Sequence, residues 1–158
     1  MIRSAGVGDR PVVLTLNEAA VPAVTPMSAD DFGFYSAVAE RFVVAADVSG
    51  FLILIGPGVD DYGSPNYRWF SERYDDFCYV DRIVVAQQHR GSGLGRNLYE
   101  FAIEIAGDRP LLAEVNTRPR NEVSLAFHDA LGFAQVGVQE VEGGSKEVAM
   151  LCRANASA

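Results

Sequence analysis

The residues best suited to chemistry in this sequence form a glycine-rich segment from Gln88 to Arg96, which reads QHRGSGLGR. Patterning places it between a predicted strand, Cys78–Val85, and a predicted amphipathic helix, Gly93–Ala106. Glycines let a backbone approach a ligand closely, and the first N–H groups of a helix have no partner inside the helix. The segment therefore predicts an anion site suited to a pyrophosphate, to which Arg90 and Arg96 add positive charge.

The spacing of the glycines separates this segment from other phosphate-binding loops. A P-loop needs Gly-Lys-Ser/Thr, whereas Gly95 is followed here by Arg96 and Asn97. A dinucleotide fingerprint follows its strand directly, whereas the residues from Ala86 to Arg90 intervene here. A glycine-rich turn without a ligand is the plain structural alternative. The two arginines, in a chain that is otherwise strongly acidic, argue against it.

Two motifs together resemble a known family. Ile83-Val84-Val85 followed by Gln88-x-x-Gly91-x-Gly93 resembles the cofactor-binding signature of GNAT acyltransferases. The segment Asn121-x-x-Ser124-x-x-Phe127-His128-x-x-x-Gly132-Phe133 resembles their second signature, in which a helix carries a Tyr near its middle and ends in Gly-Phe. The resemblance covers Cys78 to about Leu151. The chain departs from the pattern because His128 replaces the usual Tyr and the connection Asn116–Arg120 is longer.

The resemblance implies a fold, a co-substrate and a reaction. The implied fold is mixed α/β (α+β), with a mostly antiparallel sheet of about seven strands, flanking helices and two splayed central strands. The implied reaction transfers the acetyl group of acetyl-CoA to a primary amine by direct attack, without a metal. Backbone groups at Ile83–Val85 would bind the pantetheine arm and polarise the thioester carbonyl. The full set of expected cofactor-binding residues is Ile83, Val84, Val85, Arg90, Gly91, Ser92, Gly93, Leu94, Gly95, Arg96, Asn121, Ser124 and His128.

Such a reaction needs a neutral amine, a donor for the oxyanion and a proton for the departing thiolate. Two carboxylates are candidates for the base. Asp81 lies on the strand that enters the expected site, and Glu114 lies on the adjacent strand. An equally weighted alternative is that Asp81 pairs with a neighbour such as Arg82 or Arg118.

His128 is the candidate for the acid, because imidazole titrates near neutral pH. Helical spacing puts Asn121, Ser124 and His128 on one side of the predicted helix. The opposite side is the predicted apolar face, formed by Val123, Ala126, Phe127, Ala130 and Leu131. Two alternatives stay open: a cofactor contact without catalysis, and a solvated helix face with no role. A thiol nucleophile at Cys78 is disfavoured, because a Cys within an apolar strand is usually a small buried hydrophobe.

The sequence gives only a weak indication of the acetyl acceptor, in the long segment Gly56–Asp76. Asp60 and Asp61 are followed by several aromatic residues. Carboxylates and aromatic rings suit an ammonium-bearing acceptor, either a small molecule or a protein or peptide amine. The alternative is that Tyr67, Trp69 and Phe70 fill an edge of the core or a homodimer contact.

The remaining elements follow from periodicity and turn residues. Strands are predicted at Pro11–Leu16, Arg41–Ala46, Gly50–Ile55, Cys78–Val85, Leu111–Val115, Phe133–Val138 and Glu147–Leu151. Helices are predicted from an N-cap at Ser28 to about Ala39, at Gly93–Ala106 and at Asn121–Leu131. We expect one acetyltransferase domain over residues 1–158, with its core at about 11–153 and loose ends at 1–10 and 154–158.

Composition narrows the class of protein. The 158 residues carry a formal net charge of −8, so a nucleic-acid partner is not expected. The longest aliphatic run, Leu52–Ile55, is far short of the ~20 residues that span a bilayer, so no membrane association is expected. Two cysteines make no disulfide framework, which favours a cytoplasmic protein. A non-catalytic acyl-CoA-binding regulatory module is the alternative to an enzyme.

Overall fold

The computed structural model describes residues 1–154, and the chain divides into two compact units. Unit 1 comprises Met1–Gly56 and Val80–Ile105, and unit 2 comprises Pro57–Tyr79 with the residues from Ala106 on. The loose end predicted at 154–158 lies, except for Ala154, outside the described residues. The expectation of a single domain stays a prediction.

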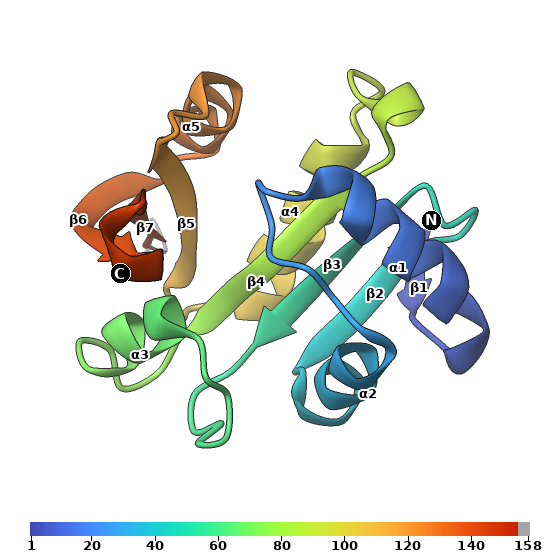
Figure 1. The fold of residues 1–158 in the computed structure, drawn as a ribbon, viewed down its shortest axis with the longest axis horizontal. Coiled ribbons are helices and arrows are strands. Elements are labelled where there is room, and N and C mark those ends of the chain that lie inside the picture. The colour runs from blue at the N-terminus through green and yellow to red at the C-terminus, as the bar shows by residue number, and fades with distance from the viewer. Residues whose placement is uncertain (155–158) are drawn as a thin grey trace. The chain divides into compact units, whose positions relative to one another are not determined.

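The strands form a mixed sheet in the order β1-β2-β3-β4-β5-β7-β6 (Figure 1). Its strands are β1 Ile2–Ser4, β2 Arg41–Ala45, β3 Gly50–Ile55, β4 Cys78–Val85, β5 Leu111–Arg118, β6 Ala134–Val141 and β7 Lys146–Arg153. The pairs β1/β2, β2/β3, β5/β7 and β6/β7 are antiparallel, and β4/β5 is parallel. The mostly antiparallel, seven-stranded sheet expected from the resemblance is therefore confirmed.

Unit 1 contains β1 to β3, most of β4, and three α-helices. These helices are α1 Arg10–Ala20, α2 Ala29–Val38 and α4 Leu94–Ala106. In Figure 1, α1 and α2 lie on the nearer face of these strands and α4 on the other. All six residues of β3 are buried between these layers. The helix predicted from Ser28 is confirmed, because the Ser28 side chain and Asp31 form a reciprocal capping box.

The N-terminal prediction was wrong in two respects. Pro11–Leu16 is part of α1 and not a strand. Its β-branched residues suggested a strand, but Pro11 suits the first turn of a helix and the buried Val13 and Asn17 lie on one helix face. The first strand is instead Ile2–Ser4, which pairs with β2 within the segment expected to be loose.

Unit 2 contains β5, β7 and β6, the first residues of β4, and two helices. Helix α3 is Pro65–Ser71 and helix α5 is Glu122–Ala130. Helix α3 falls inside the long segment predicted without regular structure. The Ser64 side chain accepts a hydrogen bond from the Tyr67 N–H and Pro65 occupies the first turn, a start signal that the sequence already contained.

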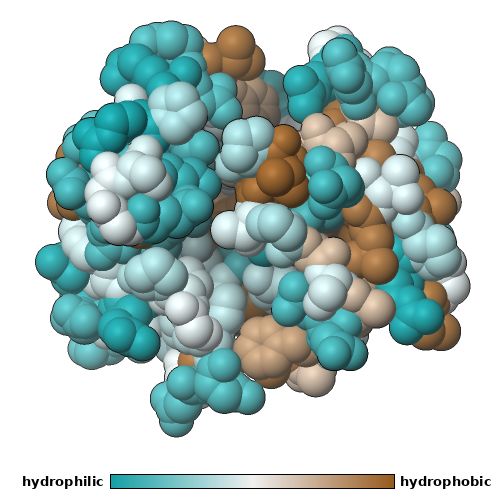
Figure 2. Space-filling model, in the orientation of Figure 1, coloured by the Kyte–Doolittle hydropathy of each residue, from teal (hydrophilic) through white to brown (hydrophobic). Residues whose placement is uncertain are grey.

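Strands β4 and β5 share a short ladder. Their paired residues are Cys78 with Leu111 and Tyr79 with Leu112, although each strand is eight residues long. The rest of β4 belongs to unit 1. Figure 2 shows hydrophilic residues over much of the visible face, with hydrophobic residues among them. Among residues 1–154, no helix has the length and apolar character needed to cross a bilayer.

Candidate active site

The glycine-rich segment forms a turn in unit 1 that opens α4. A short 3₁₀ helix, Gln87–His89, precedes it. Gly91 has φ +80° and Gly93 has φ +89°, values that side-chain-bearing residues rarely adopt. A Cβ at either position would meet no atom within 4 Å. The turn therefore needs glycine for its backbone and leaves open space in front of it.

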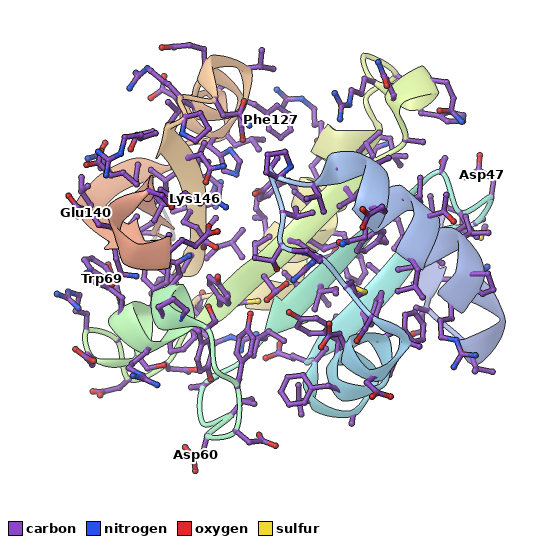
Figure 3. The ribbon with its side chains drawn as sticks, viewed as in Figure 1. Asp47, Asp60, Trp69, Phe127, Glu140 and Lys146 are labelled. Atoms are coloured by element: carbon purple, nitrogen blue, oxygen red, sulfur yellow. The ribbon has the colours of Figure 1, made fainter. Side chains whose placement is uncertain are left out.

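The turn between β2 and β3 supports this segment. The Ala86 N–H donates to the Ser49 carbonyl over 2.8 Å, and a Cβ on Gly50 would lie 2.8 Å from the Val84 carbonyl. Asp47, labelled in Figure 3, accepts hydrogen bonds from the Ser49 hydroxyl and N–H, which lower the pKa of its carboxyl. An open hollow of about 390 Å³ lies here. Its lining is Met1, Ala45, Ala46, Asp47, Ser49, His89, Ser92, Leu94 and Asn97.

These features fit the phosphate groups of a coenzyme A thioester. The first N–H groups of α4 point out of the helix end, where the macrodipole favours negative charge. Arg90 and Arg96 are exposed on either side of the two glycines. The Ser92 hydroxyl is already engaged, because it donates to the His89 carbonyl.

Along the strand that precedes the turn, burial alternates from residue to residue. Asp81, Ile83 and Val85 are half-buried, whereas Arg82 and Val84 are 6% and 4% exposed. The Asp81 side chain is only 4% exposed, so the accessible part of that residue is its backbone. Backbone exposure of β4 therefore follows at Asp81, and a ligand-binding role for the backbone of Ile83–Val85 stays a prediction.

The Asp81 carboxylate lies in a buried ion-pair network of unit 1. Arg82 donates from Nε to Asp81 over 2.6 Å, from Nη1 to Asn17 and the Thr25 carbonyl, and from Nη2 to the Thr25 hydroxyl and Tyr35. Every N–H group of the guanidinium therefore has a partner. The Tyr35 hydroxyl donates to the other Asp81 oxygen over 3.2 Å. The predicted alternative, pairing of Asp81 with Arg82, is confirmed.

The network ties strand β4 to α1, to the α1–α2 connection and to α2. Burial raises the pKa of Asp81, and the charge and hydrogen bond of Arg82 oppose that shift. Burial also raises the pKa of Tyr35 far above its usual value, so its hydroxyl keeps the proton that it donates. Sequence reasoning missed Asn17, Thr25 and Tyr35. An Asp-Arg pair within an apolar strand was the only signal.

In unit 2, the Glu114 carboxylate on β5 is held by neutral donors. The Tyr79 hydroxyl lies 2.8 Å and 2.9 Å from its two oxygens, and the Asn66 side chain donates over 3.1 Å. The Asn66 oxygen in turn accepts from Gln139 over 2.8 Å. Glu114 itself stays half-buried. Asn66, Tyr79 and Gln139 were not predicted as site residues, because their contacts join distant parts of the sequence.

His128 is buried on α5 and its ring is held at one nitrogen. Nδ1 lies 2.7 Å from the Ser124 carbonyl, so it carries a proton and donates it. The rings of Phe127 and Phe133 pack edge-on against it. Burial lowers the pKa of His128, so the ring is uncharged at neutral pH.

The structure brings Asn121, Ser124 and His128 together as predicted, but His128 is buried. Asn121 is the N-cap and accepts from the Ser124 N–H. His128 is 4% exposed, so the alternative of a solvated helix face for it was wrong. Of the predicted apolar face, Leu131 is buried and Phe127 half-buried, whereas Val123 is 82% exposed and Ala126 and Ala130 are exposed.

The fold and the glycine turn fit an acyl-CoA N-acyltransferase. The sequence profile of the acetyltransferase (GNAT) family matches residues 27–133, more than half of the chain, and the chain belongs to that family. Among curated proteins, no sequence matches it.

Solved structures of N-acetyltransferases share the fold. The ribosomal-protein-S18-alanine N-acetyltransferase from Escherichia coli has 20% identity and a TM-score of 0.67, over 98% of this chain and 92% of that one. The ribosomal-protein-alanine N-acetyltransferase from Brucella melitensis has 21% identity and a TM-score of 0.71, over 98% and 99%. NAA60 from Arabidopsis thaliana, solved with acetyl-CoA, has 13% identity and a TM-score of 0.78, over 98% and 99%. At these identities the likeness concerns the fold alone.

Proposed function

We propose that this protein transfers the acetyl group of acetyl-CoA to a primary amine, with Glu114 as the group that takes the proton of the amine. The observation that carries the proposal is the glycine turn at the start of α4, with its two positive φ angles and open space. The family match supports the same reaction. Bound acetyl-CoA supplies an activated thioester, and the chain supplies binding and proton transfer.

The co-substrate is assigned to groups of unit 1. The N–H groups of Gly91 to Arg96, with the side chains of Arg90 and Arg96, hold the pyrophosphate by charge-assisted hydrogen bonds. The β4 backbone at Ile83 and Val85 holds the pantetheine arm. Asn121 and Ser124 remain predicted contacts, although each already has a role in capping α5.

Glu114 is preferred to Asp81 as the base for a geometric reason. Both oxygens of Asp81 are engaged by Arg82 and Tyr35, and its side chain is 4% exposed. Glu114 is half-buried and accepts hydrogen bonds from the neutral donors Asn66 and Tyr79, which favour its ionised form and leave its charge uncancelled. Asp81 is therefore a residue that positions β4 and the helices packed on it.

His128 is proposed as the donor to the departing thiolate. Its Nδ1–H is committed to the Ser124 carbonyl, so the donated proton has to come from Nε2. Because burial lowers the pKa of His128, that proton is present in a fraction of molecules that falls as the pH rises. The donor role therefore carries a specific pH dependence.

The acceptor is proposed to be cationic before it reacts. The segment before α3 begins with Asp60 and Asp61, and an aromatic cluster follows in which Tyr62 packs on Tyr67 and Tyr67 on Tyr79. Tyr67 and Tyr79 are 4% and 1% exposed and fill the core, as does Phe70. Attraction of a cation therefore falls to the exposed carboxylates of Asp60 and Asp61, which would attract either a small amine or the N-terminus of a peptide. Two of the structures that share the fold are described as acting on ribosomal-protein alanine, so N-terminal peptides belong among the acceptors tested.

The test is a panel of polyamines, amino acids and N-terminal peptides, read by release of the CoA thiol. We expect at least one amine to drive release above the rate without acceptor. Glu114→Gln should lower kcat/KM for that amine by about 10²- to 10⁴-fold, with the affinity for acetyl-CoA unchanged. Tight acetyl-CoA binding without amine-dependent release across the panel would favour the non-catalytic module instead.

A further inference from the structure

Helix α3 is fastened to strand β6 by an aromatic contact. The Trp69 side chain, labelled in Figure 3, belongs to α3. A Cβ added to Gly137 would come within 2.4 Å of its ring, so the ring lies against Gly137. Arg73 stacks on the same ring at 3.6 Å from its centroid and donates to the Trp69 carbonyl. Because the Trp69 ring occupies the space that a side chain at position 137 would need, the two elements pack closely.

This docking places Asn66 beside two partners. Asn66 lies one helical turn before Trp69, and Gln139 lies two residues after Gly137 on β6. Gln139 donates to the Asn66 oxygen over 2.8 Å, and the Asn66 amide donates to Glu114 over 3.1 Å. A hydrogen-bonded chain thus runs from β6 through α3 to the carboxylate on β5.

Only one order of donors and acceptors is consistent along this series of hydrogen bonds. An ionised carboxylate only accepts hydrogen bonds, so the NH₂ group of Asn66 has to face Glu114. The Asn66 oxygen then faces away and needs a donor, which the Gln139 amide supplies. Rotating the Asn66 amide by half a turn would place its oxygen next to the Glu114 carboxylate and its NH₂ next to the NH₂ of Gln139, and both contacts would be unfavourable.

We infer that Asn66 and Gln139 are positioning residues that orient the Glu114 carboxylate and hold it ionised for the amine. The inference rests on the proposed role of Glu114. Tyr79 on β4 is a titratable group that faces Glu114, and its hydroxyl lies within hydrogen-bond distance of both carboxylate oxygens. Met150, the register partner of Glu114 on β7, is apolar. The Asn66 hydrogen bond favours the charged form of Glu114, and Gln139 keeps the Asn66 amide turned toward it.

The experiment compares Gln139→Glu with Gln135→Glu. A glutamate at 139 can only accept, so it draws the NH₂ of Asn66 toward itself and turns the Asn66 oxygen toward Glu114. Gln135 lies on the same strand and is exposed, so Gln135→Glu adds the same charge without touching Asn66. Asn66→Leu, which removes the amide altogether, is the second test variant.

Two readouts are followed against pH. One is kcat/KM for the amine, and the other is titration of the Glu114 carboxyl carbon by NMR in the full chain, which needs no turnover. We expect the acid limb of kcat/KM and the Glu114 titration to move upward together in Gln139→Glu and Asn66→Leu. The shift should be at least about half a pH unit, with Gln135→Glu like wild type.

The outcomes separate the two proposals. If neither readout moves in Gln139→Glu and Asn66→Leu, or if Gln135→Glu moves them equally, the positioning role is overturned. If the carboxyl titration moves but the rate profile does not, Asn66 and Gln139 tune Glu114 as inferred, and it is the base role of Glu114 that fails. A lower melting temperature with both midpoints unchanged would mean a purely structural role.

Discussion

At the scale of single residues, His128 shows how local contacts set a chemical role. The Ser124 carbonyl fixes which nitrogen carries the proton, and burial between two phenylalanine rings disfavours the imidazolium. A tyrosine would donate over a wide pH range, whereas this histidine, whose Nδ1–H is bound to Ser124, can donate to a thiolate only when Nε2 is protonated as well.

We predict that the effect of His128→Phe depends on pH. Near pH 6 the variant should lose about 10²- to 10⁴-fold in kcat while the affinity for CoA changes little. The loss should shrink as the pH rises, because wild type itself loses the donating proton and burial lowers the pKa of that ring. Rate profiles of both proteins from pH 5.5 to 9 check this. A loss that is constant across the range would mean that His128 acts without a titrating proton.

Asp81 illustrates the opposite case, a carboxylate in the expected place whose contacts are structural. Removing one partner of a buried, hydrogen-bonded ion pair leaves the other charge uncompensated. Asp81→Asn should therefore lower the free energy of unfolding by about 3 to 5 kcal/mol, measured by denaturant titration. Glu122→Gln removes the exposed partner of Arg120 and should change it by less than about 1 kcal/mol. Should Asp81→Asn fold as stably as wild type yet lose amine turnover, Asp81 and not Glu114 would be the base.

At the scale of elements, the glycine turn is the part of the site that the sequence described best. Spacing alone located the turn, and the structure adds the backbone conformation that explains it.

Gly93→Asp should abolish stabilisation by CoA, because a carboxylate would fill the open space and repel phosphate. Gly58→Asp is the matched control, since Gly58 has φ +85° and equally open space but lies in unit 2. The melting temperature with and without CoA measures both. Equal CoA stabilisation of the two variants would show that the turn does not hold the pyrophosphate.

Helices and strands with a clear local sequence pattern were predictable, whereas those that depend on contacts with distant parts of the chain were not. The hairpin of β2 and β3, strand β4 and helix α4 follow from local patterning, and their bounds agree with it to within a residue or so. Helix α1 was mistaken for a strand because Val12 and Val13 favour strands locally, while packing of the helix decided the outcome. Strand β1 is only three residues long and exists through its pairing with β2.

The same reasoning explains which site residues were found. Glycines and a helix start make a motif in consecutive residues, so the turn was visible in the sequence. The hydrogen bonds that join Asn66 to Glu114 and to Gln139 connect residues 48 and 73 positions apart, and no local sequence pattern predicts them. Likewise, no pattern in α5 revealed that His128 is buried.

At the scale of the whole molecule, charge and ligand binding are linked. The chain is acidic overall, with a net charge of −8, yet Arg90 and Arg96 flank the glycine turn. This contrast suits a protein that repels polyanions in general and binds one phosphate-rich co-substrate at a single turn.

The most direct test is thermal unfolding with acetyl-CoA, ATP or NAD, because it needs no knowledge of the acceptor. A ligand that binds only the folded state at one hundred times its Kd stabilises that state by about 2.7 kcal/mol. We predict that acetyl-CoA and CoA raise the melting temperature by the amount that corresponds to this stabilisation. ATP and NAD at equal concentration should raise the melting temperature far less. An unchanged melting temperature at millimolar acetyl-CoA, or an equal rise with ATP, would contradict the assignment of this protein as an acetyl-CoA-dependent enzyme.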